Sequence, residues 1–160
     1  KAPPPAPEMA QPVDLSSIQP VLQRKKVEEL TQLKKEFENL GEGTSQRNNI
    51  EGHFSRDSSA LKAVMSALDK KQGNRILVGI ERLLARAQFP NLMKVIGAKS
   101  QTDRQEIAKA IQAYYERGEA VYPVPLRNQG IEMNSPAGRE IVGKAQDEES
   151  RKNLLKILQK

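Results

Sequence analysis

Apolar residues recur at helical spacing along much of the chain, and this periodicity predicts most of its secondary structure. The first periodic stretch predicts an amphipathic helix over residues 21–40, with Gly41 as its stop signal. Its apolar stripe is narrow, so three uses stay open: packing on the rest of the chain, a seam with a partner helix or a second copy, and a leucine-rich peptide signal. The stripe consists of Val27, Leu30, Leu33, Phe37 and Leu40.

The clearest pattern lies between Asp57 and Gly118, where the apolar positions predict four helices joined by short connections. Asp57 offers an N-cap to the first helix and Gly73 is expected to end it, while Asn74 can cap the second. The second helix is apolar over a wide arc and is therefore expected at the centre of the core. The sequence predicts an all-α fold, a compact multi-helix bundle or an irregular helical array.

Residues 119–134 are not predicted to form a helix. Pro123 and Pro125 predict an extended run that covers the domain, because proline lacks the amide donor that a helix interior uses. Ser135 followed by Pro136 predicts a helix start, and residues 135–159 form one helix or two helices broken near residues 143–147. The predicted helical domain therefore extends over residues 57–160, with 57–118 as its most legible core.

Two segments that precede this domain are poor in apolar residues. Residues 1–20 contain six prolines and predict a disordered arm that prefers polyproline II, with a weak match to the PxxP ligands of SH3 domains. Residues 41–56 contain three glycines and only Ile50 and Phe54 as apolar anchors, so a flexible loop is predicted there.

Charge singles out one helix of the domain. The net charge is +6, and residues 57–118 carry 11 basic against 6 acidic side chains. Four basic residues follow each other at spacings of four, seven and four along the second helix of this stretch, which places them on one side at about 100° per residue. We call this set the basic face: Lys71, Arg75, Arg82 and Arg86.

The basic face predicts binding to carboxylates or phosphates, because an arginine can grip either group through two hydrogen bonds. The alternative is a solvated helix surface on which Glu81 and neighbouring acids dilute the positive charge. Further basic residues would extend the face if the fold brought them close, which the sequence does not decide. They are Lys94, Lys99, Arg104 and Lys109.

Other candidate chemistry is sparse. Tyr114 and Tyr115 are adjacent on a predicted helix, so one can pack in the core while the other offers a surface aromatic to a base or a partner. The single histidine, His53, lacks companions for a metal site, and the chain has no cysteine. Motifs for serine hydrolases, nucleotide binding and zinc proteases are absent from the sequence, so we predict no cofactor, no metal and no catalytic residues.

These features together predict a non-catalytic helical module for protein–protein interaction, which docks an acidic or amphipathic partner through the basic face. A nucleic-acid-binding helical domain is one alternative, and a carboxylate-dependent hydrolase is another, since that chemistry needs only two suitably spaced acids. The sequence has no apolar run long enough to span a bilayer, which needs about 18 residues or more. We therefore expect a soluble protein, and a cytoplasmic or nuclear location is favoured.

Overall fold

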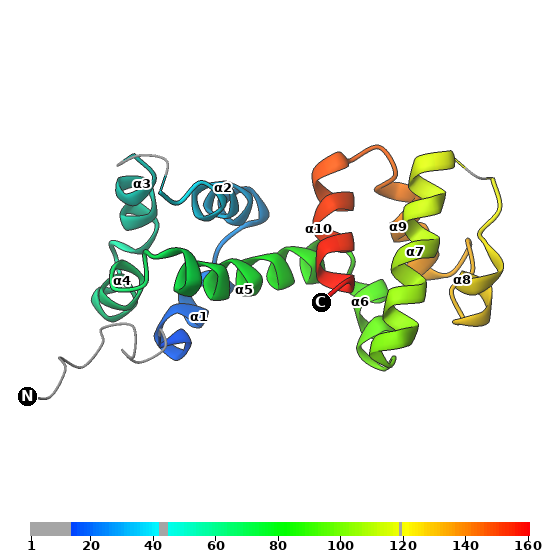
Figure 1. Cartoon of the computed structure of the whole chain (residues 1–160), viewed down its shortest axis with the longest axis horizontal. Coiled ribbons are helices and arrows are strands. Elements are labelled where there is room, and N and C mark those ends of the chain that lie inside the picture. The colour runs from blue at the N-terminus through cyan, green and yellow to red at the C-terminus, as the bar shows by residue number, and fades with distance from the viewer. Residues whose placement is uncertain (1–13, 42–44, 119) are drawn as a thin grey trace, which may run out of the picture. The chain divides into compact units, whose positions relative to one another are not determined.

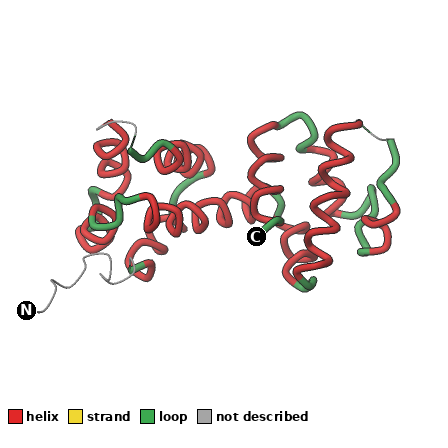
Figure 2. Tube along the Cα trace, viewed as in Figure 1, coloured by secondary structure: helices red, strands yellow, loops and turns green. Residues whose placement is uncertain are grey.

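The structure, a computed structural model, describes residues 14–41, 45–118 and 120–160 (Figure 1). Within these residues the chain forms ten helices and no strand, so the predicted all-α fold is confirmed (Figure 2). Most of the predicted proline-rich arm, residues 1–13, lies outside the described residues. None of the helices in the described ranges is both long and apolar enough to cross a membrane.

The chain divides between Ile80 and Glu81 into two compact units. In the first unit α1 packs on α4, while α3 packs on both α2 and α4 (Figure 1). The helices of this unit are α1 (Leu15–Gln23), α2 (Val27–Glu38), α3 (Ser45–Phe54), α4 (Ser58–Met65) and the first part of α5 (Lys70–Gln88).

The second unit begins with the last part of α5. Here α6 packs on α9, and α7 packs on both α8 and α10 (Figure 1). The remaining helices of this unit are α6 (Pro90–Gly97), α7 (Gln101–Arg117), α8 (Val124–Asn128), α9 (Pro136–Gly143) and α10 (Glu148–Leu158). The single domain predicted over residues 57–160 is thus divided, because α4 and the start of α5 belong with α1–α3.

Side-chain caps define where many of the helices begin. Asp57 accepts a hydrogen bond from the Ala60 amide at 3.1 Å, and Ser135 accepts one from the Gly138 amide at 3.1 Å, as their sequence positions predict. Ser100 caps α7 in the same way, and Gly118 ends that helix in a left-handed conformation with φ 60°. Each such cap typically stabilises a helix by about 1 kcal/mol, so the local sequence supplies the helix boundaries.

Two helices occupy stretches where the sequence predicted none. Helix α1 includes residues 15–20 of the predicted arm, because Ile18 and Leu22 are fully buried and this burial offsets the amide donor lost at Pro20. Helix α3 replaces the predicted flexible loop. Its two apolar anchors, Ile50 and Phe54, are four residues apart on one helical face, and both are buried in the first unit.

Glycine and proline were also misjudged as helix breakers. Gly73 lies inside α5, which begins earlier, at Lys70. A Cβ at Gly73 would come within 2.6 Å of the Leu40 side chain, so this glycine permits close packing rather than ending a helix. Pro123 and Pro125 stand at the start of α8, where the first-turn amides need no helical acceptor, and the predicted extended run is therefore interrupted by a helix.

The core of the second unit consists of aliphatic side chains together with Tyr114 and Tyr122, and Tyr115 packs against it. Tyr122 is almost fully buried, and its hydroxyl donates a hydrogen bond to the carbonyl oxygen of Gly138 at 2.6 Å. The rings of Tyr114 and Tyr122 meet edge to face with their centroids 5.3 Å apart. Burial raises the pKa of the Tyr122 hydroxyl above its usual range, so it stays a protonated donor and ties α9 to the segment that precedes α8.

We expect Gly138→Ala to destabilise the second unit by about 2–3 kcal/mol, because a Cβ there would overlap the backbone carbonyl of Glu132. Gly143→Ala in the same helix is the matched control, since a Cβ at that position meets no atom within 4 Å. This variant should not lower the unfolding free energy and can raise it by up to about 0.5–1 kcal/mol. Equal unfolding free energies for the two variants would contradict the close approach at Gly138.

Urea unfolding followed by tyrosine fluorescence makes this comparison selective for the second unit. The chain has three tyrosines and no tryptophan, and all three tyrosines belong to that unit. They are Tyr114, Tyr115 and Tyr122.

Candidate functional site

The predicted basic face is exposed, but its four members do not belong to one unit. Lys71 and Arg75 lie on the part of α5 that belongs to the first unit, and Arg82 and Arg86 lie on the part that belongs to the second. Each pair is therefore considered within its own unit.

Arg82 and Arg86 lie beside two further cations of the second unit, Arg104 and Lys160, and the four side chains line one depression of about 260 Å³. Sequence reasoning had considered Arg104 as an extension of the basic face but had not considered Lys160. Apolar side chains complete the lining, so the surface combines charge with hydrophobic contact. We call this surface the basic depression, and its remaining lining residues are Met93, Ile96, Gly97 and Ile157.

Two helices, α5 and α7, and the residue Lys160 after α10 bring these cations together. Arg82 and Arg86 are four residues apart on α5 and therefore share a face. Arg104 lies near the start of α7, whose position is set by the Ser100 cap, and Lys160 follows α10. Because the cations come from α5, α7 and the end of α10, only the tertiary packing of these elements creates the depression.

The electrostatics of the basic depression favour an anion. Among the described residues, none of those lining the depression is acidic, and none pairs with Arg82 or Arg86. The Nε atom of Arg104 is buried and has no hydrogen-bond partner within the described part of the chain. An unpartnered buried donor is costly, so a ligand oxygen that reached Arg104 would relieve that cost.

Glu81 directly precedes Arg82 in the sequence, and its side chain is fully buried. Its carboxylate forms an ion pair with Lys156 of α10 at 2.6 Å. It also lies 3.5 Å from the Nζ atom of Lys160, which follows α10. The Asn153 side chain donates to the Glu81 backbone carbonyl at 3.1 Å. Glu81 thus fastens α10 to α5 from within, and its contact with Lys160 offsets part of the charge of that cation, while Arg82 and Arg86 pair with no described residue.

The other predicted interaction residues are mostly used in packing. Leu30, Leu33 and Phe37 are at most 4% exposed in the core of the first unit, where α2 packs on α3. Only Val27 and Leu40 of the predicted seam are partly accessible. Among the three uses considered for this helix, the burial of these three residues favours packing within its own unit.

The tyrosine pair does not provide a free aromatic surface. Tyr114 is buried, and Tyr115 is covered because the Arg151 guanidinium lies over its ring, 5.6 Å from the centroid. The Tyr115 hydroxyl donates to the Ile141 carbonyl at 3.1 Å, and burial raises its pKa above the usual range. The outward-facing tyrosine that the sequence suggested is therefore engaged within the second unit.

The two acids that line one pocket of the first unit already form hydrogen bonds within the fold. These two carboxylates are Glu29 and Asp57. Glu29 accepts a hydrogen bond from the Lys26 amide at 3.2 Å, and Asp57 caps α4 through the Ala60 amide. Both carboxylates serve helix starts. No group of three or more His, Cys, Asp or Glu residues within the described ranges is arranged to hold a metal ion.

Comparisons of this chain with protein-family models, with curated proteins and with solved structures find no match.

We expect Lys156→Met to destabilise the second unit by about 3 kcal/mol, because it leaves the fully buried Glu81 carboxylate with only the longer contact to Lys160. Lys152→Met is the matched control on the same helix. Lys152 pairs with Glu148 at the surface, so its replacement should leave the unfolding free energy nearly unchanged. Urea unfolding read by tyrosine fluorescence compares them, and an equal effect would contradict the anchoring role of Glu81.

Proposed function

We propose that this chain is a non-catalytic docking module that binds an acidic, amphipathic segment of another protein through the basic depression. The observation that carries the proposal is the convergence of Arg82, Arg86, Arg104 and Lys160 on one depression whose described lining includes no acid. Charge of one sign gathered in a concave surface attracts opposite charge and guides association.

The apolar part of the depression favours a protein segment as the occupant. Met93, Ile96 and Ile157 lie among the cations, so an acidic side chain and an apolar side chain of one helix could be bound together. Methionine adapts its shape to varied apolar partners, which suits a docking surface. Arginine supplies two parallel hydrogen bonds to a carboxylate and is enriched at protein interfaces.

Nucleic acid is the alternative occupant, because the same cations would neutralise phosphates. Two features favour the acidic protein segment over it. The depression is small, whereas a nucleic-acid surface follows a backbone over many phosphates. The aromatic nearest to a stacking role in the second unit, Tyr115, is covered by Arg151 and hydrogen-bonded to Ile141.

The double variant Arg82→Glu/Arg86→Glu tests the proposal. Each exposed ion pair is worth up to about 1 kcal/mol, and charge reversal replaces attraction by repulsion, so affinity for a short acidic amphipathic peptide should fall by roughly tenfold or more. Fluorescence anisotropy of the labelled peptide measures this loss. The unfolding free energy should change by less than about 0.5 kcal/mol, because both arginines are exposed and pair with no described residue.

Arg127→Glu/Arg139→Glu is the matched control, since both arginines are exposed in the second unit and neither lines the depression. The control variant has the same net charge as the test variant. After correction for the effect of overall charge, its affinity for the peptide should equal that of the unaltered protein. Equal affinities for the two double variants would remove the depression from the proposal. Tighter binding to single-stranded DNA than to the peptide, with a steep loss as salt rises, would favour the nucleic-acid alternative.

A further inference from the structure

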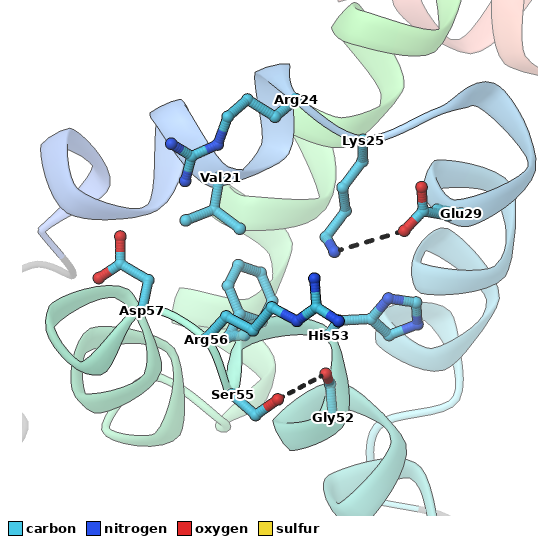
Figure 3. A pocket seen from close by; sticks show the side chains of 10 residues that line it. Val21, Arg24, Lys25, Glu29, Gly52, His53, Ser55, Arg56 and Asp57 are labelled. Carbon is cyan, nitrogen blue, oxygen red and sulfur yellow. Dashed lines mark hydrogen bonds and ion pairs between the residues drawn. The ribbon is translucent and has the colours of Figure 1, made fainter.

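The first unit contains a second concave surface, which neither the basic face nor the proposed docking function uses. It has a volume of about 640 Å³, within the range of small-molecule sites, and lies where the end of α1, the start of α2 and the end of α3 meet (Figure 3). We call it the His53 pocket, because the single histidine of the chain is part of its lining.

Nitrogen-bearing side chains converge on this pocket from different elements. Figure 3 shows the ends of Lys25 and Arg56 directed into the pocket with the His53 ring beside them, while the Arg24 guanidinium lies at the rim and is turned to the other side. Arg24 and Lys25 follow α1, His53 belongs to α3, and Arg56 lies between α3 and α4. Like charges brought together in a concave surface repel each other, and a bound anion would remove that repulsion.

The two acids of the pocket do not neutralise these cations fully. Asp57 holds the start of α4, and Glu29 accepts from the Lys26 amide, with its other oxygen 3.8 Å from the Lys25 Nζ atom. That last separation is long for an ion pair, and half of the Glu29 side chain is exposed. No described residue pairs with the guanidinium group of Arg24 or Arg56.

Part of the pocket is fixed before any ligand arrives. The Lys25 side chain is only 11% exposed, and its ammonium lies over the Phe54 ring, 5.8 Å from the centroid. Phe54 itself is buried and forms a rigid wall with Val21. A cation held in this way loses little conformational freedom when it binds an anion, which favours affinity.

His53 is half-buried, and its surroundings lower the pKa of its imidazole. Burial is the main cause, and the Lys25 charge acts in the same direction, while Glu29 and Glu36 oppose them. The imidazole is therefore neutral near pH 7 and can donate one N–H to a ligand without adding a further positive charge. An anion in the pocket would reverse this balance, since it stabilises the imidazolium and raises the pKa.

We propose that the His53 pocket binds a phosphate monoester, whose phosphate group is held by Arg56 and Lys25 with His53 as an additional donor, while the unpaired Arg24 at the rim adds positive charge. A phosphate dianion offers three terminal oxygens in a tetrahedral arrangement, which suits donors that approach from several directions. A carboxylate is planar and singly charged, so one arginine fork satisfies it. The pocket is larger than a phosphate group alone, which leaves room for the organic part of the ester.

This inference does not depend on the docking function, because the two surfaces share no residue and belong to different units. Failure of one proposal would leave the other unchanged.

The single histidine makes the pocket directly observable by NMR. Titration of the full chain with O-phosphoserine at constant ionic strength and pH 7.5 should shift the His53 imidazole signals in a saturable way, while serine should not. Sulfate, a tetrahedral dianion over the whole range of the experiment, should raise the His53 pKa when present at saturation. An unchanged histidine signal with O-phosphoserine, or saturation by succinate at the same concentration, would overturn the proposal.

Arg24→Gln/Arg56→Gln should weaken O-phosphoserine binding by roughly tenfold or more, because Arg56 no longer donates charged hydrogen bonds to the phosphate and Arg24 no longer adds positive charge to the pocket. Arg47→Gln/Lys62→Gln is the matched control. It removes two exposed charges from the same unit, outside the pocket, and should leave the affinity unchanged. All four side chains are exposed, so both variants should keep the circular dichroism of the unaltered protein. Equal affinities for the two variants would overturn the assignment of Arg24 and Arg56.

Discussion

The second unit depends on one buried charge. Glu81 has no exposed surface, and a carboxylate taken out of water is costly unless a cation compensates it. Lys156 and Lys160 supply that compensation, which requires α10 to pack beside the last part of α5. The same packing places Ile157 and Lys160 in the basic depression. The interaction that holds the unit together therefore also builds the surface on which the proposed docking function rests.

Beside both concave surfaces the neighbouring acids form contacts within the fold, but these contacts differ between the two units. In the second unit, the nearby acid is buried and committed to α10, which leaves Arg82, Arg86 and Arg104 to face the depression. In the first unit, the acids lie in the pocket but are committed to helix starts. Glu81 and Glu29 each also lie beside one cation of these surfaces, Lys160 and Lys25, so they offset part of the charge and leave the arginines unpaired.

Prediction from sequence succeeded where the determining interactions are local. Caps at Asp57 and Ser135 and the glycine stop at Gly118 depend on side chains within a few residues, and the structure has them. It failed where tertiary burial outweighs local preference, as at α1 and α3, where Ile18, Leu22, Ile50 and Phe54 are buried as α1 packs on α4 and α3 packs on α2 and α4. For the site, helical spacing placed Arg82 and Arg86 on one side of a helix, but it could not supply Lys160 or decide that Arg104 joins them.

The sequence by itself determined the all-α class, the helix starts at Asp57 and Ser135, the end at Gly118 and the alignment of basic residues on α5, because these follow from periodicity and capping within single segments. Only the tertiary structure decided that α5 is shared by two units, that Glu81 is buried, and that cations of α5 and α7 meet Lys160 after α10. The physical reason is that burial and electrostatic convergence are properties of packed surfaces, and residues about 20–80 positions apart can share a surface without leaving any local pattern.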